Sequence, residues 1–592
     1  MYTELKSYQI IIALLKKWGI RHCVLSAGSR NVPFVHSIEK DDFFNCYSVV
    51  DERSAGYFAL GLAQQIQEPV VISCTSSTAT CNYWPPVAEA FYQGVPIIIM
   101  TSDRNPAMLG QWEDQMIDQV GMFDRHVRKS VNLPSEINNQ DDWIYCQRLV
   151  NEALLELNHH GTGPVHINIP MKSYNNSFNT SKLPQVTKIE RIECLSDEKT
   201  WTEKAQKLAK AKRILVTIGQ RSFFDEKLNK SLNEFFRKFN SAISIDYMSN
   251  VECDGSFNAT IAMDTRYITV NKFKEFVPDI VISLGGNVFG GIKDMLLKYK
   301  GEFEHWSIQE DGRVVDMYKS ITTIFECPYE YFFHKINAAI GNTQTNDREY
   351  FHSITHYINK VVYPEFEYGN IYAIKNIVEK IPSGSTVHLS INDSIRITNF
   401  FKLNPHIKVF ANIGTHGIDG CMSSLIGQSV QTDKLCFLII GDLAFFYDMN
   451  AIRIRHMNKN VRILLINNHG GEEFYFNHMW KDQYSDLHTT ARHNTKAEGW
   501  VKENNFIYLS AVDKESYNKA LPEFMQPKSD KPIFFEVFTE MKTDADSIYS
   551  FFDKSRPRDL QSEFIRNTKE LIKKTIGEDK AKKIASSLGK KI

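Results

Sequence analysis

The sequence predicts an α/β protein built from parallel sheets flanked by helices. Short, continuous runs of Val, Ile and Leu alternate with helical stretches along almost the whole chain. Such runs are typical of parallel strands that helices cover on both faces. The chain has 592 residues, too many for one hydrophobic core, so we expect two to four domains. The clearest predicted strands are PVVISCTSS, VPIIIMTSDR, KRILVTIG, DIVISLGG, KLCFLIIGD and NVRILLINN.

Two polar stretches divide the chain. Residues 171–188 follow the predicted strand GPVHINIP, and residues 341–350 follow a predicted helix. Their composition is typical of linkers between domains. We therefore predict three domains of comparable size, with the third carrying an extra helical tail from about residue 555. The predicted domains are residues 1–180, 181–345 and 346–592.

The composition disfavours two classes of protein. Lys and Arg total 69 against 70 Asp and Glu, a formal net charge of -1, whereas nucleic-acid-binding proteins usually have a basic surplus. The N-terminal stretch MYTELKSYQIIIALLKKWGI predicts an amphipathic helix that lacks a signal-peptide cleavage site and is too charged to span a membrane. The 10 cysteines contain no C-x-x-C pair, which is typical of reduced thiols. We expect a cytoplasmic protein without a membrane span that does not bind nucleic acid.

Oxygen-bearing residues follow two predicted strands of the third block. Asp442 comes after Gly441 at the end of KLCFLII, and Asn468 follows RILLIN, 468 − 442 = 26 residues later. That spacing suits one strand–helix–strand crossover, which places both residues at the carboxyl edge of a parallel sheet. Their side chains and the Gly470 carbonyl are hard oxygen donors suited to Mg²⁺, which usually completes its shell with phosphate and water. A helix that begins after Gly441 would also favour a bound phosphate.

Each dipeptide has a simpler explanation on its own. Gly-Asp can cap a helix, and Asn-Asn can form a turn. The joint spacing, with each pair directly after a buried strand, favours the metal and phosphate site instead.

These residues resemble the cofactor motif of the thiamine-diphosphate-dependent enzymes. The first block is similar to the pyrimidine-binding domain of these enzymes, and its segment VDERSAGYFALGLA places a glutamate at Glu52. The resemblance implies that Glu52 hydrogen-bonds N1′ of the cofactor and promotes loss of the proton at thiazolium C2, a suitable task for a buried carboxyl. It also implies that Ile418 supports the bent cofactor. The alternative for Glu52 is a surface salt bridge with Arg53 or another neighbouring residue.

The resemblance carries an expectation about assembly. In these enzymes the active site lies between the first domain of one subunit and the third domain of another. We therefore expect a homodimer or homotetramer in which Glu52 faces Asp442 across a subunit interface.

Further segments resemble one branch, the 2-succinyl-5-enolpyruvyl-6-hydroxy-3-cyclohexene-1-carboxylate synthases of menaquinone biosynthesis. That branch decarboxylates 2-oxoglutarate and joins the product to isochorismate. By position, Ser29, Arg30, Arg104 and Gln115 match its acceptor-binding residues, and paired arginines suit a dicarboxylic acceptor. The segments are AGSRNVPF, CTSSTATCNYWPPVAEA, TSDRNP, EDQMIDQVGMF, GIDG, GDLAFFYDMNA and NNHGGEEF.

The chain also departs from the branch where the donor binds. Ile413 stands where the branch has an arginine, and Glu473 stands where it has an apolar residue. Asn392 replaces a donor-binding serine, although Arg396 is retained. Losing a cation and gaining an anion should disfavour the distal carboxylate of 2-oxoglutarate. The donor is therefore open between 2-oxoglutarate and a smaller 2-oxo acid such as pyruvate, and a simple 2-oxo acid decarboxylase is the related alternative.

Two other classes remain as alternatives. A catalytically silent homologue would not need Glu52, Asp442 and Asn468 together. A nucleotide-binding α/β protein is disfavoured because both G-x-x-x-x-G-K-[ST] and a strand-linked G-x-G-x-x-G are absent. The basic amphipathic tail at 559–592 could bind a membrane surface or a partner, but we expect it to pack on its own domain.

Overall fold

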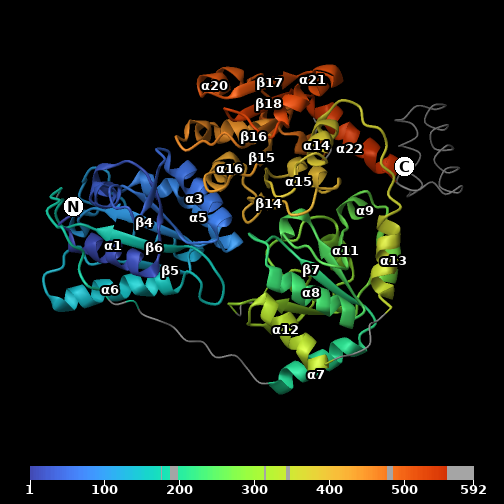
Figure 1. Cartoon of the computed structure of the whole chain (residues 1–592), viewed down its shortest axis with the longest axis horizontal. Helices are drawn as coiled ribbons and strands as arrows, with labels where there is room; N and C mark the ends of the chain where they lie inside the picture. Colours follow the sequence, from blue (N-terminus) through green and yellow to red (C-terminus); the bar gives the residue numbers. More distant parts are fainter. Residues whose placement is uncertain are drawn as a thin grey trace, which may run out of the picture.

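The computed structural model contains three six-stranded sheets (Figure 1). It describes residues 1–174, 176–186, 188, 198–311, 315–341, 347–476 and 485–555. Every strand pairing within the sheets is parallel. The predicted fold class, parallel sheets flanked by helices, is confirmed. One sheet lies in each predicted block, and the exact block boundaries stay a prediction.

The first domain is built on the strands β1 to β6, in the order β2-β1-β3-β4-β6-β5. Its central strands β3, β4 and β6 are buried along their whole length, as their continuous apolar sequences predict. The strands are β1 (His22–Leu25), β2 (Asn45–Ser48), β3 (Val70–Cys74), β4 (Ile97–Asp103), β5 (Lys129–Asn132) and β6 (Val165–Pro170). The helices are α1 (Lys6–Trp18), α2 (Val32–Ile38), α3 (Glu52–Ile66), α4 (Thr78–Asn82), α5 (Trp84–Gln93) and α6 (Gln140–Leu155).

The middle domain has a different strand order, β12-β11-β10-β7-β8-β9. Numbered within the domain and reversed, this order is 3-2-1-4-5-6, that of doubly wound dinucleotide-binding folds. The strands are β7 (Ile214–Ile218), β8 (Ser241–Ile245), β9 (Ser256–Asn258), β10 (Ile280–Leu284), β11 (Glu304–Ile308) and β12 (Ile321–Phe325). The helices are α7 (Glu198–Lys210), α8 (Glu226–Lys238), α9 (Thr260–Asp264), α10 (Val270–Phe273), α11 (Ile292–Lys298), α12 (Tyr329–Ile340) and α13 (Glu349–Ile358).

The third domain repeats the topology of the first. Its order, β14-β13-β15-β16-β18-β17, matches that of the first sheet strand for strand. The strands are β13 (Thr386–Leu389), β14 (Lys408–Ala411), β15 (Cys436–Gly441), β16 (Val461–Asn467), β17 (Ile507–Ala511) and β18 (Ile533–Phe538). The helices are α14 (Asn370–Val378), α15 (Asp393–Thr398), α16 (Cys421–Ser429), α17 (Asp442–Tyr447), α18 (Glu472–Phe476), α19 (Ser485–Thr490), α20 (Glu498–Glu503), α21 (Lys514–Phe524) and α22 (Met541–Ser555).

The first and third domains share a hydrophobic core through α3 and α16, which lie side by side in Figure 1. Glycines at the crossing allow this approach. A Cβ atom on Gly61 would lie 1.7 Å from the carbonyl oxygen of Ser424, and one on Gly427 would lie 1.9 Å from that of Phe58. Only a residue without a side chain fits at these two positions, so the two glycines allow α3 and α16 to pack this closely.

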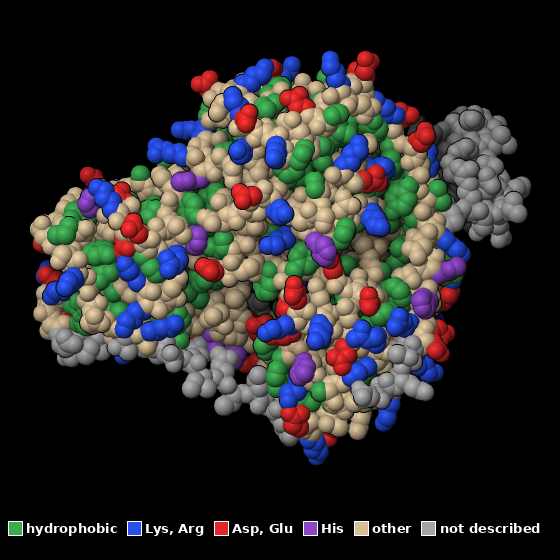
Figure 2. All heavy atoms as spheres, viewed as in Figure 1, with side chains coloured by type: hydrophobic (Ala, Val, Ile, Leu, Met, Phe, Trp, Pro, Cys, Tyr) green, Lys and Arg blue, Asp and Glu red, His purple; other side chains and the backbone are tan. Residues whose placement is uncertain are grey.

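The surface agrees with the balanced composition. Figure 2 shows Lys, Arg, Asp and Glu side chains interspersed over the visible face. Among the described residues, no helix is long and apolar enough to cross a membrane. The predicted basic tail at 559–592 lies outside the described residues.

Candidate active site

The predicted metal residues of the third domain lie at one edge of its sheet. Asp442 follows β15 and begins α17, while Asn468 and Gly470 follow the neighbouring strand β16. The backbone N–H of Gly470 donates to Asp442 Oδ2 at 3.0 Å. The Asp442 carboxylate is 2% exposed and the Asn468 side chain 6%. The structure thus brings together the tips of two strands, as the 26-residue spacing predicted.

The residue types at this edge suit a metal that also binds phosphate. A Cβ atom added to Gly441 would meet nothing within 4 Å, so the strand tip borders open space. His469 Nδ1 is buried nearby without a hydrogen-bond partner among the described residues, and His493 Nε2 lies 3.3 Å from Asp442 Oδ2. Buried polar atoms are normally satisfied, so this edge is suited to an additional polar group. The oxygens of Asp442 and Asn468 are the kind of ligand that Mg²⁺ prefers.

The two asparagines of the Asn-Asn pair have different environments. Asn467 is held within the domain, because its amide donates to Glu536 Oε1 at 2.7 Å and to the Thr495 carbonyl at 3.0 Å. The Asn468 amide donates to Glu472 Oε2 at 3.2 Å. That bond orients the Asn468 side chain, and a hydrogen-bonded second layer of this kind is usual behind metal ligands.

Glu472 belongs to a group of buried carboxyls behind the strand tips. Its Oε2 also accepts from Asn370 Nδ2 at 2.9 Å. Burial, followed by the negative charges of Asp393 and Asp544, raises its pKa well above the ordinary value. Burial likewise raises the pKa of Asp544 to about 7. The carboxyl edge of the third sheet is therefore rich in acidic groups.

Arg396, predicted to bind the donor, is paired with carboxylates of its own chain. Its Nη1 bonds to Asp393 Oδ1 and lies 3.3 Å from Glu473 Oε2. Burial alone would lower the pKa of Arg396, but Asp393 and Glu473 more than offset it, and the pKa is raised. The contact with Asp393 was missed by sequence reasoning. Its only signal was an acid three residues before Arg396, a spacing that joins side chains on one helix face.

Two of the three donor-site departures, Ile413 and Asn392, lie in different surroundings. Ile413 is fully buried in the core, and its carbonyl accepts from Asn287 Nδ2 of the middle domain at 2.6 Å. Asn392 is exposed just before α15 and has φ of 59°. Ile418 lies in the same loop as Ile413, between β14 and α16. It is partly buried and packs against the core shared by the first and third domains.

The four predicted acceptor residues form one cluster on the first domain. Arg104 Nε donates to the Gln115 carbonyl at 3.2 Å, and its Nη1 lies 2.7 Å from Glu113 Oε1. The Arg30 guanidinium stacks 4.5 Å from the centre of the Tyr174 ring, whose hydroxyl donates to the Ser29 carbonyl at 2.6 Å. Burial, and then the charge of Arg104, lowers the pKa of Arg30. Two neighbouring guanidinium groups are well suited to an anion.

Glu52 lies at the start of α3, where Asp51 caps the helix by accepting from the Ser54 N–H at 3.2 Å. Its Oε2 accepts from Asn82 Nδ2 at 3.3 Å. Arg53 instead donates to the Tyr447 carbonyl at 2.7 Å, and among the described residues it forms no ion pair with Glu52. The salt-bridge alternative therefore finds no support in the described part of the chain.

One residue that joins the domains was missed from the sequence. Glu89 on α5 is fully buried and accepts from the backbone N–H of Gly414 at 2.9 Å and of Thr415 at 2.8 Å. Burial raises its pKa. It ties the first domain to the loop that leads to Ile418. The available signal was an acid inside the otherwise apolar stretch WPPVAEAF.

Comparisons with known proteins agree with this geometry. A family model described as "Thiamine pyrophosphate enzyme, N-terminal TPP binding domain" matches residues 5–122. A curated 2-succinyl-5-enolpyruvyl-6-hydroxy-3-cyclohexene-1-carboxylate synthase of Bacteroides thetaiotaomicron is 36% identical over 565 residues, which cover 94% of this chain and 100% of the relative. Proteins of the same name from Phocaeicola vulgatus and Flavobacterium psychrophilum are 36% and 30% identical, and each match covers 93% of this chain and 99% of the relative.

These matches confirm the predicted resemblance and its cofactor, thiamine diphosphate, with Mg²⁺ as the usual partner metal of such enzymes. They also support the prediction that the chain is a thiamine-diphosphate-dependent enzyme. Because the relatives match over nearly their whole length, the chain belongs to the family of 2-succinyl-5-enolpyruvyl-6-hydroxy-3-cyclohexene-1-carboxylate synthases, which are thiamine-diphosphate-dependent enzymes.

Proposed function

We propose that this enzyme decarboxylates a 2-oxo acid and joins the product to an anionic acceptor. With 2-oxoglutarate as the donor and isochorismate as the acceptor, the product is the 2-succinyl-5-enolpyruvyl-6-hydroxy-3-cyclohexene-1-carboxylate for which its relatives are named. The observation that carries the proposal is the hydrogen bond between Gly470 and Asp442 at 3.0 Å, beside open space at Gly441. Bound thiamine diphosphate supplies the carbanion chemistry that the side chains of the protein lack.

The residues of the third domain would hold the cofactor. We assign Asp442, Asn468 and the Gly470 carbonyl to Mg²⁺, and through it to the diphosphate. Glu472 would keep the Asn468 amide in place through its 3.2 Å hydrogen bond. Since α17 has only six residues, we assign the diphosphate to the metal rather than to that helix terminus. Ile418 would support the bent cofactor.

The residues of the first domain would handle the proton and the acceptor. We assign Glu52 to hold and transfer a proton at N1′ of the aminopyrimidine, the role implied by the family resemblance. Arg30 and Arg104, with Ser29 and Gln115 beside them, would bind a carboxylated acceptor. Bidentate pairing of guanidinium with carboxylate makes this cluster selective for an anion.

The identity of the donor depends on Arg396. A donor with a distal carboxylate, such as 2-oxoglutarate, would have to compete with Glu473, which lies 3.3 Å from Arg396. A donor with a neutral end, such as pyruvate, would leave that pair intact. The pairing therefore favours pyruvate as a second candidate donor beside 2-oxoglutarate.

A panel of 2-oxo acids tests the function directly. The purified enzyme, supplied with thiamine diphosphate and Mg²⁺, is assayed for CO₂ release from each acid with and without isochorismate, and the product mass is measured. We expect a condensed product only when both substrates are present. If CO₂ is released equally without isochorismate and no condensed product forms, the enzyme is a simple decarboxylase. If 2-oxoglutarate is the best donor by a wide margin, the proposed effect of Ile413 and Glu473 is wrong.

We also propose a homo-oligomer with active sites between subunits. Among the described residues no hydrogen bond or ion pair joins Glu52 to Asp442, although both lie in one chain. Glu52→Gln and Asp442→Ala subunits, each inactive alone, can be co-expressed with different tags. A shared site predicts recovery of about a quarter of normal activity, because half of the dimers would be mixed and would keep one intact site. If the mixture stays inactive while mixed dimers form, each site is built within one subunit.

A further inference from the structure

A cavity of about 570 Å³ lies between the first and middle domains, apart from the proposed active site. Figure 2 shows the surface hollowed where these two domains meet. The floor is the carboxyl edge of the middle sheet, formed by the residues after β7, β10 and β11. β7 and β10 are the neighbours at which the strand order reverses. In doubly wound sheets that position is the usual ligand crevice, and the volume is in the range of small-molecule sites.

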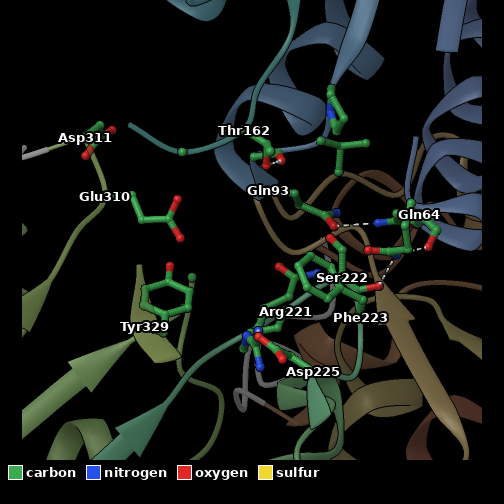
Figure 3. Close-up of a pocket in the computed structure, with 18 of the residues that line it drawn as sticks. Gln64, Gln93, Thr162, Arg221, Ser222, Phe223, Asp225, Glu310, Asp311 and Tyr329 are labelled. Atoms are coloured by element: carbon green, nitrogen blue, oxygen red, sulfur yellow. Dashed lines mark hydrogen bonds and ion pairs between the residues drawn. The ribbon is translucent and has the colours of Figure 1, made fainter. Parts of the chain in front are cut away.

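Arg221 contributes a buried charge to the cavity (Figure 3). Arg221 is 7% exposed, and its Nη1 has no hydrogen-bond partner among the described residues. Asp225 Oδ2 is 4.0 Å from Nη2, too far for a direct hydrogen bond. Burial lowers the pKa of Arg221. A buried guanidinium without full compensation costs free energy, and a bound carboxylate would remove that cost.

Two acidic side chains line the same cavity. Glu310 follows β11, Glu330 lies in the first turn of α12, and neither has an ion-pair partner among the described residues. Burial, and then the charge of Glu330, raises the pKa of Glu310. A third acid, Asp311, lies 3.7 Å from Arg128. A cation between Glu310 and Glu330 would relieve their repulsion.

Aromatic side chains border the charged groups. The Phe223 and Tyr329 rings lie 5.3 Å and 5.6 Å from the guanidinium carbon of Arg221, and Tyr92 lines the cavity from the first domain. Figure 3 shows Tyr329 between Arg221 and Glu310. An occupant therefore has apolar surface to bury next to both kinds of charge.

We propose that this cavity binds a small zwitterion with an aromatic or apolar body, the chemistry of an aromatic amino acid. The carboxylate pairs with Arg221, the ammonium group lies between Glu310 and Glu330, and the body packs against Phe223 and Tyr329. A multiply charged anion such as a nucleotide is excluded, because the acidic pair would repel its phosphates.

Hydrogen bonds connect the lining of the cavity to the loop before Ile418. The lining residues Gln93 and Gln220 both donate to the Ala411 carbonyl, at 3.0 Å and 2.5 Å. Gln93 also bonds to Glu89, which holds Gly414 and Thr415. A ligand that shifts either glutamine changes the start of this loop.

Calorimetric titration of the full-length protein tests the binding. The probes are L-phenylalanine, 3-phenylpropionate, which lacks the ammonium, and phenethylamine, which lacks the carboxylate. We expect L-phenylalanine to bind, and each analogue to bind at least about tenfold more weakly because one charge pair is lost. Arg221→Met should abolish binding of L-phenylalanine. Arg148→Met, at an exposed arginine of α6, should leave it unchanged.

The proposal is overturned if no L-phenylalanine binding is detected, if 3-phenylpropionate binds as tightly, or if Arg221→Met binds normally. Should Arg221→Met fail to fold, Glu310→Gln decides, and it should weaken L-phenylalanine binding while leaving 3-phenylpropionate unaffected. The titration does not depend on turnover. Binding by an enzyme without carboligase activity would therefore overturn only the proposed function, and carboligase activity without binding would overturn only this site.

Discussion

The first and third domains share one strand order and yet carry opposite chemistry at the same edge. At the carboxyl ends of the third and fourth strands, the third domain has Asp442 and Asn468. At the corresponding places, directly after β3 and β4, the first domain has Thr75 and Arg104. One edge carries a buried carboxylate, while the other carries two neighbouring arginines, Arg30 and Arg104. Topology therefore sets where a site can form, and the residues at the strand ends decide which ligand it takes.

This difference indicates that two domains of the same topology have different tasks, one in binding the cofactor and the other in binding the substrate. The acidic edge suits a metal and its diphosphate, and the basic edge suits an anionic substrate. The close packing of α3 on α16 keeps the two domains in a fixed relation.

The largest effect is expected from removing the acidic edge. Asp442→Ala should lower the affinity for Mg²⁺ and thiamine diphosphate by roughly 100-fold or more, because even indirect changes around a metal cost about 10–100-fold. Glu52→Gln should keep the cofactor but lower turnover by about 10²–10⁴-fold, the usual contribution of proton transfer. Cofactor bound per subunit and initial rates measure the two effects separately.

The contrast between the two variants is the decisive outcome. If Glu52→Gln releases the cofactor while Asp442→Ala retains it, the assignment of the two edges is reversed. If Glu52→Gln retains near-normal turnover, the proposed proton route is wrong.

Much of the acidic edge could be predicted from the sequence, because it depends on which residues directly follow a strand. A buried parallel strand is a continuous apolar run, and a polar residue directly after it must lie at the sheet edge. Asp442 and Asn468 were placed in this way. The pairing of Arg396 with Glu473 was not accessible, because 77 residues separate the two and only the assembled sheet edge brings them together.

The features between domains were also inaccessible from the sequence. The cavity at Arg221 exists only because the middle sheet faces α5 and the loop at His160 of the first domain. Nothing in the local pattern around Arg221 indicates that its guanidinium is buried. Likewise, Glu89 gave a signal only as an acid in an apolar helix, without its partners in the loop at Gly414.

The docking of the two domains can be broken at the helix crossing. Gly61→Val should lower the free energy of unfolding by at least about 3 kcal/mol, because the added atoms meet the Ser424 backbone and no side-chain rotation relieves the clash. Gly499→Ala in α20 is the matched control, since an added Cβ there meets nothing within 4 Å; it should stabilise by about 0.5–1 kcal/mol. Urea unfolding measures both, and equal effects would contradict the proposed role of the crossing.

A smaller effect is expected from the acid beside Arg396. Glu473→Gln should raise the ratio of kcat/KM for 2-oxoglutarate to that for pyruvate by about threefold to tenfold, because a partly exposed charge pair is worth little more. Glu540→Gln, at an exposed acid after β18, should leave the ratio unchanged. A ratio that does not move in Glu473→Gln would remove Glu473 from donor selection.

The smallest effect concerns two strand ends, one in each domain, that share an unusual backbone conformation. Ser77 follows β3 with φ of 72° and ψ of -127°, and Asn392 follows β13 with φ of 59° and ψ of -121°. This backbone conformation costs a side-chain-bearing residue about 1–3 kcal/mol. A glycine at this position would itself cost about 0.5–1 kcal/mol, because glycine loses more conformational freedom on folding than other residues.

Ser77→Gly should therefore stabilise the protein by about 1 kcal/mol, measured by urea unfolding. Ser547→Gly, inside α22, is the control and should destabilise it by a similar amount. If Ser77→Gly is instead destabilising, the serine contributes contacts that outweigh its strain, and this edge of the first domain depends on its side chain as the third domain depends on Asp442.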